Sequence, residues 1–346
     1  MPFPGLPRIE HVADVYRLLP AEDDARRFLE GMIWPEGRRC PGCREGRTTV
    51  LPPRGRRAGC YQCCGCRMQF SATSHTPLHG TKLDLRLWVV AIVLLLASSK
   101  GISSVALARM LGVTQKTAWR MGHAVRLMMR EVGPALAPYE GTVEVDSTFV
   151  GGEPRPQVGV LHPRGRGTYR QPVVVAAERG GRARAAPIAG HGVGAVGPFV
   201  STWVAPEATL VSDGDRAMVA LGKGRAAHQV VIHGAKAFVD PTTGAHINTV
   251  ESFASSVERA RVGVFHRITG PHLQRYLDEL LWRWNHRIPE VHTRIGTGGK
   301  IRHQTRWTPW SISAMMEKMF ATAIGRGLRR TANYGLRFIE PAVFGG

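Results

Sequence analysis

The alternation of apolar and polar residues is clearest in GTVEVDSTFVGG, which covers residues 141–152. Val143 and Val145 fall on one face of a strand with this pattern, whereas Glu144 and Asp146 fall on the other. The pattern therefore predicts a half-buried strand that ends at a glycine turn. One face packs on a core and the opposite face carries carboxylates.

More strands are predicted downstream of this one. QPVVVAAERGGRARAAPIAG (171–190) gives two strands around Gly180–Gly181, a dipeptide that permits a tight hairpin turn. ATLVSDGDRA predicts a strand that ends at Asp213, and HQVVIHG (228–234) predicts a further short buried strand.

Two amphipathic helices follow these strands. In HINTVESFASSVERARVGVF (246–265), Val250, Phe253 and Val257 recur at helical spacing on one side. Asn248, Glu251, Ser255 and Glu258 cluster on another side of the same helix. GPHLQRYLDELLWRWNHR (270–287) is predicted to be a second amphipathic helix with its leucines inward.

The preceding segment, residues 81–131, has a wholly helical pattern. A buried helix is followed by SSVALARMLGVTQKTAWRMGHAVRLMMRE, which has the pattern of a helix-turn-helix. Ser103 or Ser104 can cap its first helix, Gly112 supplies the turn, and Thr114 can cap its second. The outward-facing residues early in that second helix would meet a major groove, and they are Gln115, Lys116 and Arg120. A plain packing module is the alternative.

The whole pattern predicts a multidomain α+β protein with five parts. These are a helical lead-in (1–35), a cysteine-rich module (36–80), a helical region (81–133), a mixed-sheet α/β domain (140–290) and a basic C-terminal arm (291–346). The last part has nine Lys or Arg against two Glu, which suits an arm laid on a polyanion; an ordinary solvated tail is the alternative.

The net charge of the chain indicates which class of molecule it binds. The chain has 46 Lys and Arg against 26 Asp and Glu, giving a net charge of +20, so nucleic acid is the first expectation. Leu87–Ala97, the most apolar stretch, is far shorter than the roughly 20 residues that cross a bilayer, and the N-terminus lacks a secretory-signal pattern. We therefore expect no membrane partner and a cytoplasmic location, in association with the nucleoid when the protein is bound to DNA.

All six cysteines lie between Cys40 and Cys66, which in a reducing compartment favours a metal over disulfides. The pairs Cys40–Cys43 and Cys63–Cys66 each have C-x-x-C spacing and are separated by 19 residues, as in a zinc ribbon. Cys60 and Cys64 leave the register of the second pair open. We expect a structural Zn²⁺, with DNA contacts from the adjacent basic loop at Arg54, Arg56 and Arg57.

Three acids are candidates for a catalytic metal site. Asp146 lies on the first strand, Asp213 ends a later strand, and Glu251 lies on the following helix, with 37 residues between Asp213 and Glu251. Acids brought together from separate elements can hold Mg²⁺ or Mn²⁺, and two such ions can activate a hydroxyl and stabilise the leaving oxygen of a phosphodiester. The arrangement is typical of an RNase H-like nuclease core.

The same motifs resemble a known family. VEVDSTFVGG, VSDGDRA, NTVE, HLQRYLDE, WNHR and the YQCCGCRMQF knuckle together resemble bacterial insertion-sequence transposases of the DDE type with an N-terminal zinc ribbon (ISXO2-like). The resemblance implies cleavage at the terminal inverted repeats of an element by water, then strand transfer by the freed 3′ hydroxyl. It also implies binding to those ends and to target DNA, as a homodimer or larger assembly.

The chain departs from the family pattern at several positions. Ser147 follows Asp146 where relatives have Glu, and Glu258 stands where they often have Lys. Arg259 and Arg261 are the nearby candidates for DNA contact. Because some relatives use Asn in place of the third acid, Asn248 is an alternative to Glu251.

Other acids are expected to have lesser roles. Glu144 is interpreted as a supporting or surface residue, and Asp278 and Glu279 are expected to face solvent or to pair with Arg275 and Arg283. Two rival functions stay open at this point, namely a zinc-bearing DNA-binding regulator without catalysis and a nuclease that nicks without strand transfer.

Overall fold

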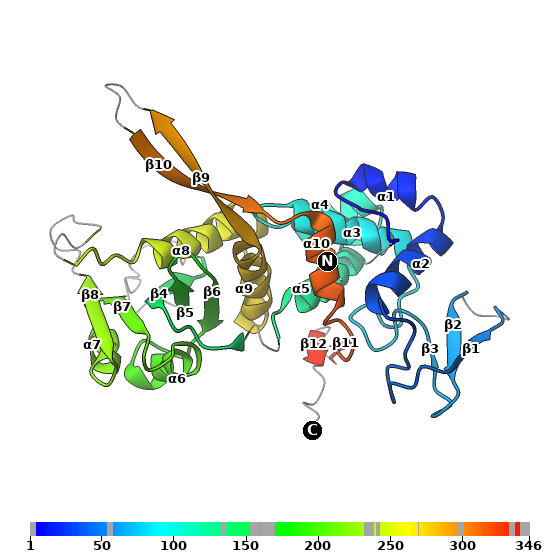
Figure 1. Cartoon of the computed structure of the whole chain (residues 1–346), viewed down its shortest axis with the longest axis horizontal. Coiled ribbons are helices and arrows are strands. Elements are labelled where there is room, and N and C mark those ends of the chain that lie inside the picture. The colour runs from blue at the N-terminus through cyan, green and yellow to red at the C-terminus, as the bar shows by residue number, and fades with distance from the viewer. Residues whose placement is uncertain are drawn as a thin grey trace. The chain divides into compact units, whose positions relative to one another are not determined.

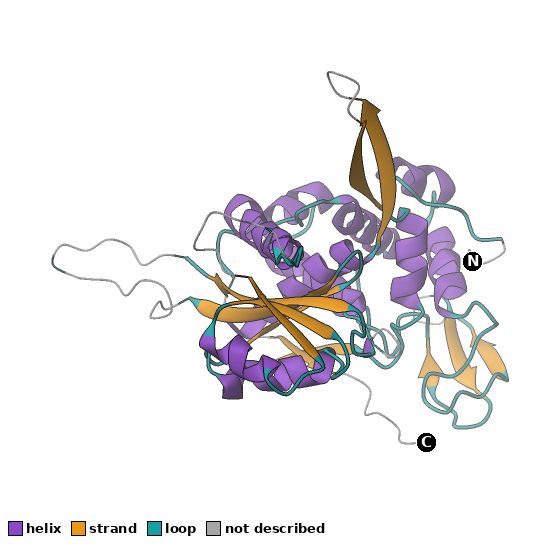
Figure 2. Ribbon diagram, turned by 60° about the vertical axis from the view of Figure 1, so that its left-hand side comes forward, coloured by secondary structure: helices purple, strands orange, loops and turns teal. Residues whose placement is uncertain are grey.

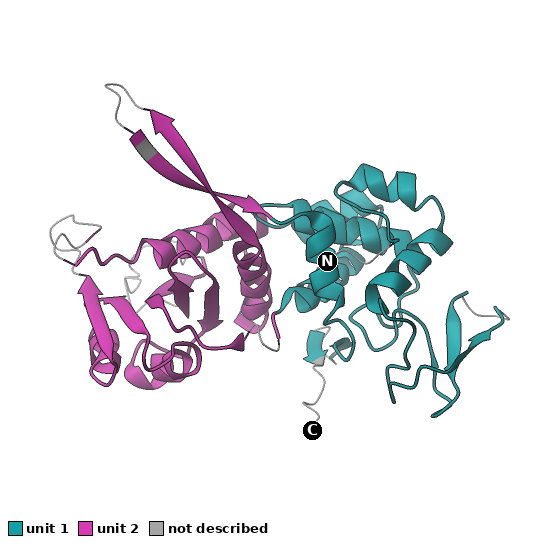
Figure 3. Cartoon of the chain, viewed as in Figure 1, with its two compact units in different colours: residues 1–130, 310–346 teal, residues 131–309 magenta. Residues whose placement is uncertain are grey.

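The computed structural model describes residues 5–53, 58–132, 136–152, 159, 170–231, 239, 243–268, 270–295, 301–331 and 336–339. Helices and strands both contribute to it (Figures 1 and 2), which confirms the predicted α+β class. The chain divides into two compact units, one formed by residues 1–130 with 310–346 and the other by residues 131–309 (Figure 3).

The first unit is mainly helical, with a small sheet and a short hairpin. Its elements are α1 (Val12–Leu18), α2 (Glu22–Ile33), β1 (Thr48–Leu51), β2 (Cys60–Cys63), β3 (Gln69–Phe70), α3 (Leu85–Ala97), α4 (Ser104–Leu111), α5 (Gln115–Met129), α10 (Ile312–Phe320), β11 (Gly327–Arg330) and β12 (Leu336–Ile339). Strands β1, β2 and β3 form an antiparallel sheet in that order.

Helix α3 lies at the centre of the helical part. It is apolar on nearly every side, and a helix of that kind is stable only when buried. It contacts α1, α2, α4, α5 and α10. The predicted lead-in and the predicted helical region therefore pack together in one unit.

The region predicted as a basic C-terminal arm, residues 291–346, contains regular elements. Its first part belongs to a β hairpin, and α10 returns to pack on α2, α3 and α5. The N-terminal segment caps α10, because the Glu10 carboxylate accepts the N–H of Ile312 at 2.8 Å and the Ser313 hydroxyl accepts the N–H of Ile9 at 2.9 Å. A count of basic residues did not reveal the apolar face of α10, which buries Met316 and Phe320.

The second unit is built on a five-stranded mixed sheet in the order β6-β5-β4-β7-β8. Its elements are β4 (Thr142–Val150), β5 (Gln171–Glu178), β6 (Ala183–Pro187), α6 (Val193–Trp203), β7 (Thr209–Asp213), α7 (Arg216–Gly222), β8 (Ala227–Val231), α8 (Asn248–Ala260), a π-helical turn (Arg261–Phe265), α9 (Gly270–Asn285), β9 (Arg287–Ile295) and β10 (Ile301–Pro309).

Strand β4 occupies the middle of this sheet. It pairs antiparallel with β5 and parallel with β7, while β6 extends the sheet beyond β5 and β8 extends it beyond β7. The β5–β6 hairpin turns at Gly180–Gly181 as predicted, with Gly180 in the left-handed region at φ 67°. This is the mixed sheet that was predicted for residues 140–290.

Helices cover both faces of the sheet. Val143 and Val145 pack with residues of α6, whereas Val173, Val175 and Val211 belong to the core beneath α8 and α9. Within the part of the chain that the structure describes, no helix has the length and apolar character needed to cross a bilayer.

Candidate functional site

Asp146 and Asp213 are brought to neighbouring positions by the pairing of β4 with β7. Val145 is in register with Ser212, so the next step along the two parallel strands places Asp146 beside Asp213. Neighbouring strands lie about 4.8 Å apart, and residues in register point to the same face. Both aspartates are half-buried, on the face of the sheet that α8 covers.

Each aspartate is held by a short backbone contact. The N–H of Ser147 donates to Asp146 Oδ1 at 2.7 Å. The N–H of Asp215 donates to Asp213 Oδ1 at 3.1 Å, which is the pattern of an Asx turn. Asp215 immediately precedes α7, in keeping with the turn role predicted for it. These contacts use one oxygen of each carboxylate.

Glu144 fixes α8 to the same strand. Its side chain is fully buried, and its carboxylate accepts the N–H of Thr249 at 2.7 Å, the Thr249 hydroxyl at 2.8 Å and the N–H of Val250 at 3.2 Å. Arg179 Nε donates to it at 3.3 Å, and His246 Nδ1 lies 3.1 Å away. Ile247, which precedes α8, has no side-chain cap of its own. Glu144 therefore supplies from β4 the cap that α8 lacks locally.

Asn248 and Glu251 occupy the first turn of α8. They are three residues apart, so they lie on the same side of the helix, and both are exposed. Val250, Phe253 and Val257 pack inward as predicted. Among the described residues, Asp146, Asp213 and Glu251 do not form a group with all ligand atoms within 4.8 Å of one another. The third ligand, Glu251 or Asn248, therefore stays a prediction.

The basic residues at the end of α8 and the start of the π-helical turn differ in how available they are to a ligand. Arg259 is exposed and donates to the hydroxyls of Ser255 and Ser256. Arg261 is only 14% exposed and pairs with Glu258, whose pKa this pairing lowers despite partial burial. The charge of Arg261 is therefore already partly neutralised, which weakens it as a predicted DNA contact.

Helices α4 and α5 form the predicted pair around a glycine turn. The Ser103 hydroxyl caps α4 through the N–H of Ala106, and the Thr114 hydroxyl caps α5 through the N–H of Thr117. Gly112 adopts the left-handed conformation between them. Gln115 and Lys116 are exposed at the start of α5, and Arg120 is half-buried one turn later. Gln115 donates to the Ser104 hydroxyl at 2.8 Å and so ties α5 to α4.

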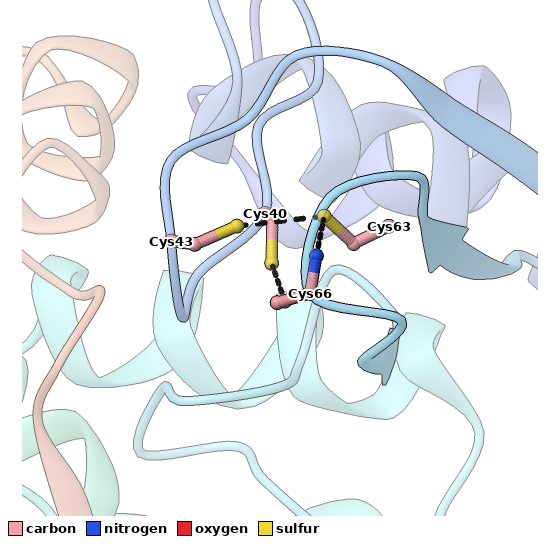
Figure 4. Close-up of side chains that lie close together, drawn as sticks. All are labelled: Cys40, Cys43, Cys63 and Cys66. Carbon is pink, nitrogen blue, oxygen red and sulfur yellow. Dashed lines mark hydrogen bonds between the residues drawn. The ribbon is translucent and has the colours of Figure 1, made fainter.

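Four cysteines converge between the loop before β1 and the turn after β2 (Figure 4). Cys40, Cys43, Cys63 and Cys66 have sulfur atoms within 4.8 Å of one another, with 3.6 Å between Cys40 and Cys66 and 3.5 Å between Cys43 and Cys63. Zn–S bonds of about 2.3 Å give a tetrahedron whose edges are about 3.8 Å, so the four thiols fit zinc. This answers the question of register, because Cys60 and Cys64 lie outside the group.

The backbone of the second knuckle supports a thiolate. Burial raises the pKa of Cys63, but the N–H of Cys66, the Cys43 thiol and the N–H of Gly65 outweigh it and bring that pKa to about 7. Arg38 lies with its guanidinium 3.5 Å from the Tyr61 ring, beside the cluster of Trp34, Tyr61 and Phe70. The predicted contacts of Arg54, Arg56 and Arg57 lie outside the described residues.

The four-cysteine group and the sheet that carries Asp146 and Asp213 both lie in segments that match models of protein families. Residues 20–69 match the family model of the transposase zinc-ribbon domain, and residues 138–285 match that of the ISXO2-like transposase domain. The two matches together cover more than half of the chain. The chain belongs to this transposase family. No curated protein in a similar comparison matched it.

The second match contains every candidate catalytic residue of the transposase. It spans β4 with Asp146, β7 with Asp213 and α8 with Asn248 and Glu251. The β9–β10 hairpin and α10 lie beyond the matched residues. The family assignment therefore supports a transposase role for the second unit and leaves the hairpin unexplained.

One feature of the transposase was missed from sequence, and another was predicted only in part. Glu144 was interpreted as a supporting or surface residue, although its complete burial and its bonds to α8 make it the cap of that helix. The signal that could have revealed this role is Ile247, which directly precedes α8 and has no side chain that can cap the helix. Glu279 was expected to face solvent or to pair with Arg275 or Arg283. It pairs with Arg283 at 2.7 Å, in agreement with the second alternative, but its complete burial was not predicted.

Proposed function

We propose that this transposase cleaves DNA at the terminal inverted repeats of its own element and joins the freed ends to target DNA. The observation that carries the proposal is the placement of Asp146 and Asp213 side by side on the face of the sheet covered by α8. The match of this unit to a transposase domain supports the same function. A second reaction centre would be needed to process the second end, so we infer a homodimer or larger assembly on DNA.

The donor set suits a hard divalent cation. Asp146 and Asp213 would hold Mg²⁺ or Mn²⁺ with Glu251 or Asn248 as the third ligand, because such ions prefer oxygen ligands and keep several waters. When bound, the ions supply activation of the attacking hydroxyl and stabilisation of the leaving oxygen. Glu144 holds the first turn of α8 against β4, and this restricts where the third ligand can lie.

DNA binding is assigned to three surfaces. Gln115, Lys116 and Arg120 at the start of α5 are proposed to enter a major groove, since a helix capped at that point presents its first turn to bases. Arg259 on α8 is proposed to contact phosphate near the cleaved strand, and Arg261 to assist it. The zinc ribbon, with a structural Zn²⁺ on its four cysteines, completes the binding region.

The deciding experiment is metal-dependent nicking of a duplex that carries the element's end. Asp146→Asn and Asp213→Asn should each lower the nicking rate at least about 100-fold. Each substitution removes a ligand of the metal ions, and these ions would stabilise the transition state by several kcal/mol. Glu251→Gln and Asn248→Ala, made in parallel, identify the third ligand as whichever abolishes nicking. Glu207→Gln, an exposed acid just before β7, is the matched control and should cleave normally.

The rival functions give different results in the same assay. Tight binding to the ends without nicking by the wild type would contradict catalysis and support a regulator. Nicking without joined product, even when target DNA is supplied, would support a simple nuclease.

A further inference from the structure

The β9–β10 hairpin is exposed along almost its whole length. The two strands pair from Arg287 with Pro309 to Ile295 with Ile301. Every residue from 288 to 295 is exposed, as are residues 301 and 303–306. The hairpin extends away from α8 and α9 (Figure 1). Nine residues per strand give a ribbon about 30 Å long.

The base of the ribbon is firmly attached to α9. The Arg287 guanidinium lies 3.8 Å from the Trp284 ring and 4.9 Å from the Trp307 ring, and its Nε donates to the Trp284 carbonyl at 2.8 Å. Burial lowers the pKa of Arg287 to about 10. Stacking of a guanidinium between two rings sets the direction in which the ribbon leaves the unit.

The register separates the ribbon into two unlike faces. One face carries Pro289, Val291, Thr293 and Ile295 with their partners Ile301, His303, Thr305 and Trp307. The other carries Ile288, Glu290, His292 and Arg294, and opposite them Gln304, Arg306 and Thr308. We call the second set the polar face. It offers a row of hydrogen-bonding side chains.

Charge on the ribbon is strongly positive. Residues 287–309 contain Arg287, Arg294, Lys300, Arg302 and Arg306 against Glu290 alone. Glu290 lies opposite Arg306 and 3.5 Å from His292, so it neutralises only part of the polar face.

An isolated two-stranded ribbon is at best marginally stable in water, so a partner is expected to cover it. Val291, Ile295 and Ile301 are 68%, 77% and 60% exposed, which by itself would suit a protein partner. Charge opposes a second copy of the ribbon, because two such segments would bring like charges together. A polyanion would instead neutralise the positive charge of the polar face. DNA is such a polyanion, and its major groove, about 12 Å wide in the B form, admits a two-stranded ribbon.

We propose that the β9–β10 hairpin inserts its polar face into the major groove of DNA at the element's end. Arg294, Gln304 and Arg306 are the residues that would meet base edges and flanking phosphates. The inference rests on the proposed function for the identity of the DNA. It adds a recognition element that lies beyond both family matches.

The test measures binding by the full chain without divalent metal. A labelled duplex carrying the element's end is compared with a random duplex of equal length. Arg294→Gln with Arg306→Gln should weaken end binding about 10–100-fold and lower the salt dependence, since each lost phosphate contact removes about 0.9 from the logarithmic slope. The wild type should also protect guanine N7 atoms from methylation at sites that the double variant leaves open. Thr293→Gln with Thr305→Gln, on the opposite face of the same ribbon, is the matched control and should retain both properties.

Unchanged affinity and unchanged N7 protection in the arginine double variant would overturn the proposal. If Val291→Lys then converted a larger assembly to a smaller one in sedimentation, the ribbon would be assigned to contact with a second copy. Binding without cleavage by the wild type would defeat the proposed chemistry and leave the ribbon proposal standing. A wild type that does not bind the end duplex would defeat both.

Discussion

At the scale of single residues, Glu144 links β4, the strand of Asp146, to α8, the helix of Asn248 and Glu251. A fully buried carboxylate is tolerated because the N–H groups of Thr249 and Val250, the Thr249 hydroxyl and Arg179 all donate to it. Hydrogen bonds to a charged group contribute about 1.5–3 kcal/mol each. Glu144 is two residues from Asp146, so its bonds to α8 also set the position of Asn248 and Glu251 relative to that aspartate.

Replacement of Glu144 by Gln is expected to reduce nicking about 10- to 100-fold while end binding stays unchanged. The amide keeps the size of the side chain but loses the charge that faces Arg179 and two backbone donors, so the start of α8 becomes less well fixed. Cleavage rate, end affinity and thermal unfolding should be measured together. Glu140→Gln, an exposed acid just before the same strand, is the control.

A second variant separates positioning from simple loss of stability. If Glu144→Asp restores the melting temperature of the unit without restoring nicking, the exact reach of the carboxylate matters for the reaction. Nicking at the wild-type rate in Glu144→Gln would show that the first turn of α8 needs no such anchor.

At the scale of elements, features set by local chemistry were predictable. The caps at Ser103 and Thr114, the left-handed Gly112 and the turn at Gly180–Gly181 each depend on residues within one turn of themselves. The alternation in β4 likewise predicted which face carries the carboxylates, but α8 and α9 pack over that face as well, so β4 is not the half-buried strand that was predicted. These features needed no knowledge of the rest of the fold.

Features set by distant partners were not predictable in the same way. Glu144 and its donors on α8 are separated by about a hundred residues of sequence, and nothing near Glu144 signals the contact. Arg326 counted as one charge of a basic tail, yet it is buried and donates to the carbonyls of Leu127 and Met128 at the end of α5. Charge counting cannot separate an arginine that meets solvent from one that completes a helix terminus.

The cysteine-rich element offers a matched pair of substitutions. Cys63→Ser should abolish zinc binding and lower the melting temperature of the zinc ribbon. The reason is that the metal takes the place of a hydrophobic core, which so short a segment cannot build. Cys64→Ser alters the neighbouring residue, whose sulfur contacts the Thr49 hydroxyl at 3.7 Å and lies outside the four-cysteine group. Zinc content per chain, measured on purified protein, should be one for the wild type and for Cys64→Ser. Equal zinc loss in both variants would contradict the assigned ligand set.

At the scale of the whole molecule, the second unit is an insertion in the first. The chain leaves the helical unit after residue 130, builds the sheet and the ribbon, and returns at residue 310 to add α10. The two chain segments of the helical unit are therefore interdependent. Met316, Met319 and Phe320 are at most 1% exposed, and the segment at Ile9 and Glu10 holds the start of α10.

Stability is the measurement that distinguishes this arrangement from a solvated tail. Phe320→Ala should lower the free energy of unfolding of the helical unit by about 3–5 kcal/mol, the usual cost of removing a buried Phe side chain. Urea denaturation of the full chain, followed by helical circular dichroism, would report it. Lys318→Ala removes an exposed side chain from the same helix and should change the unfolding free energy by less than about 0.5 kcal/mol. Equal and small effects of the two substitutions would mean that α10 does not contribute to the core, and the C-terminal region would then act as the arm that its charge suggested.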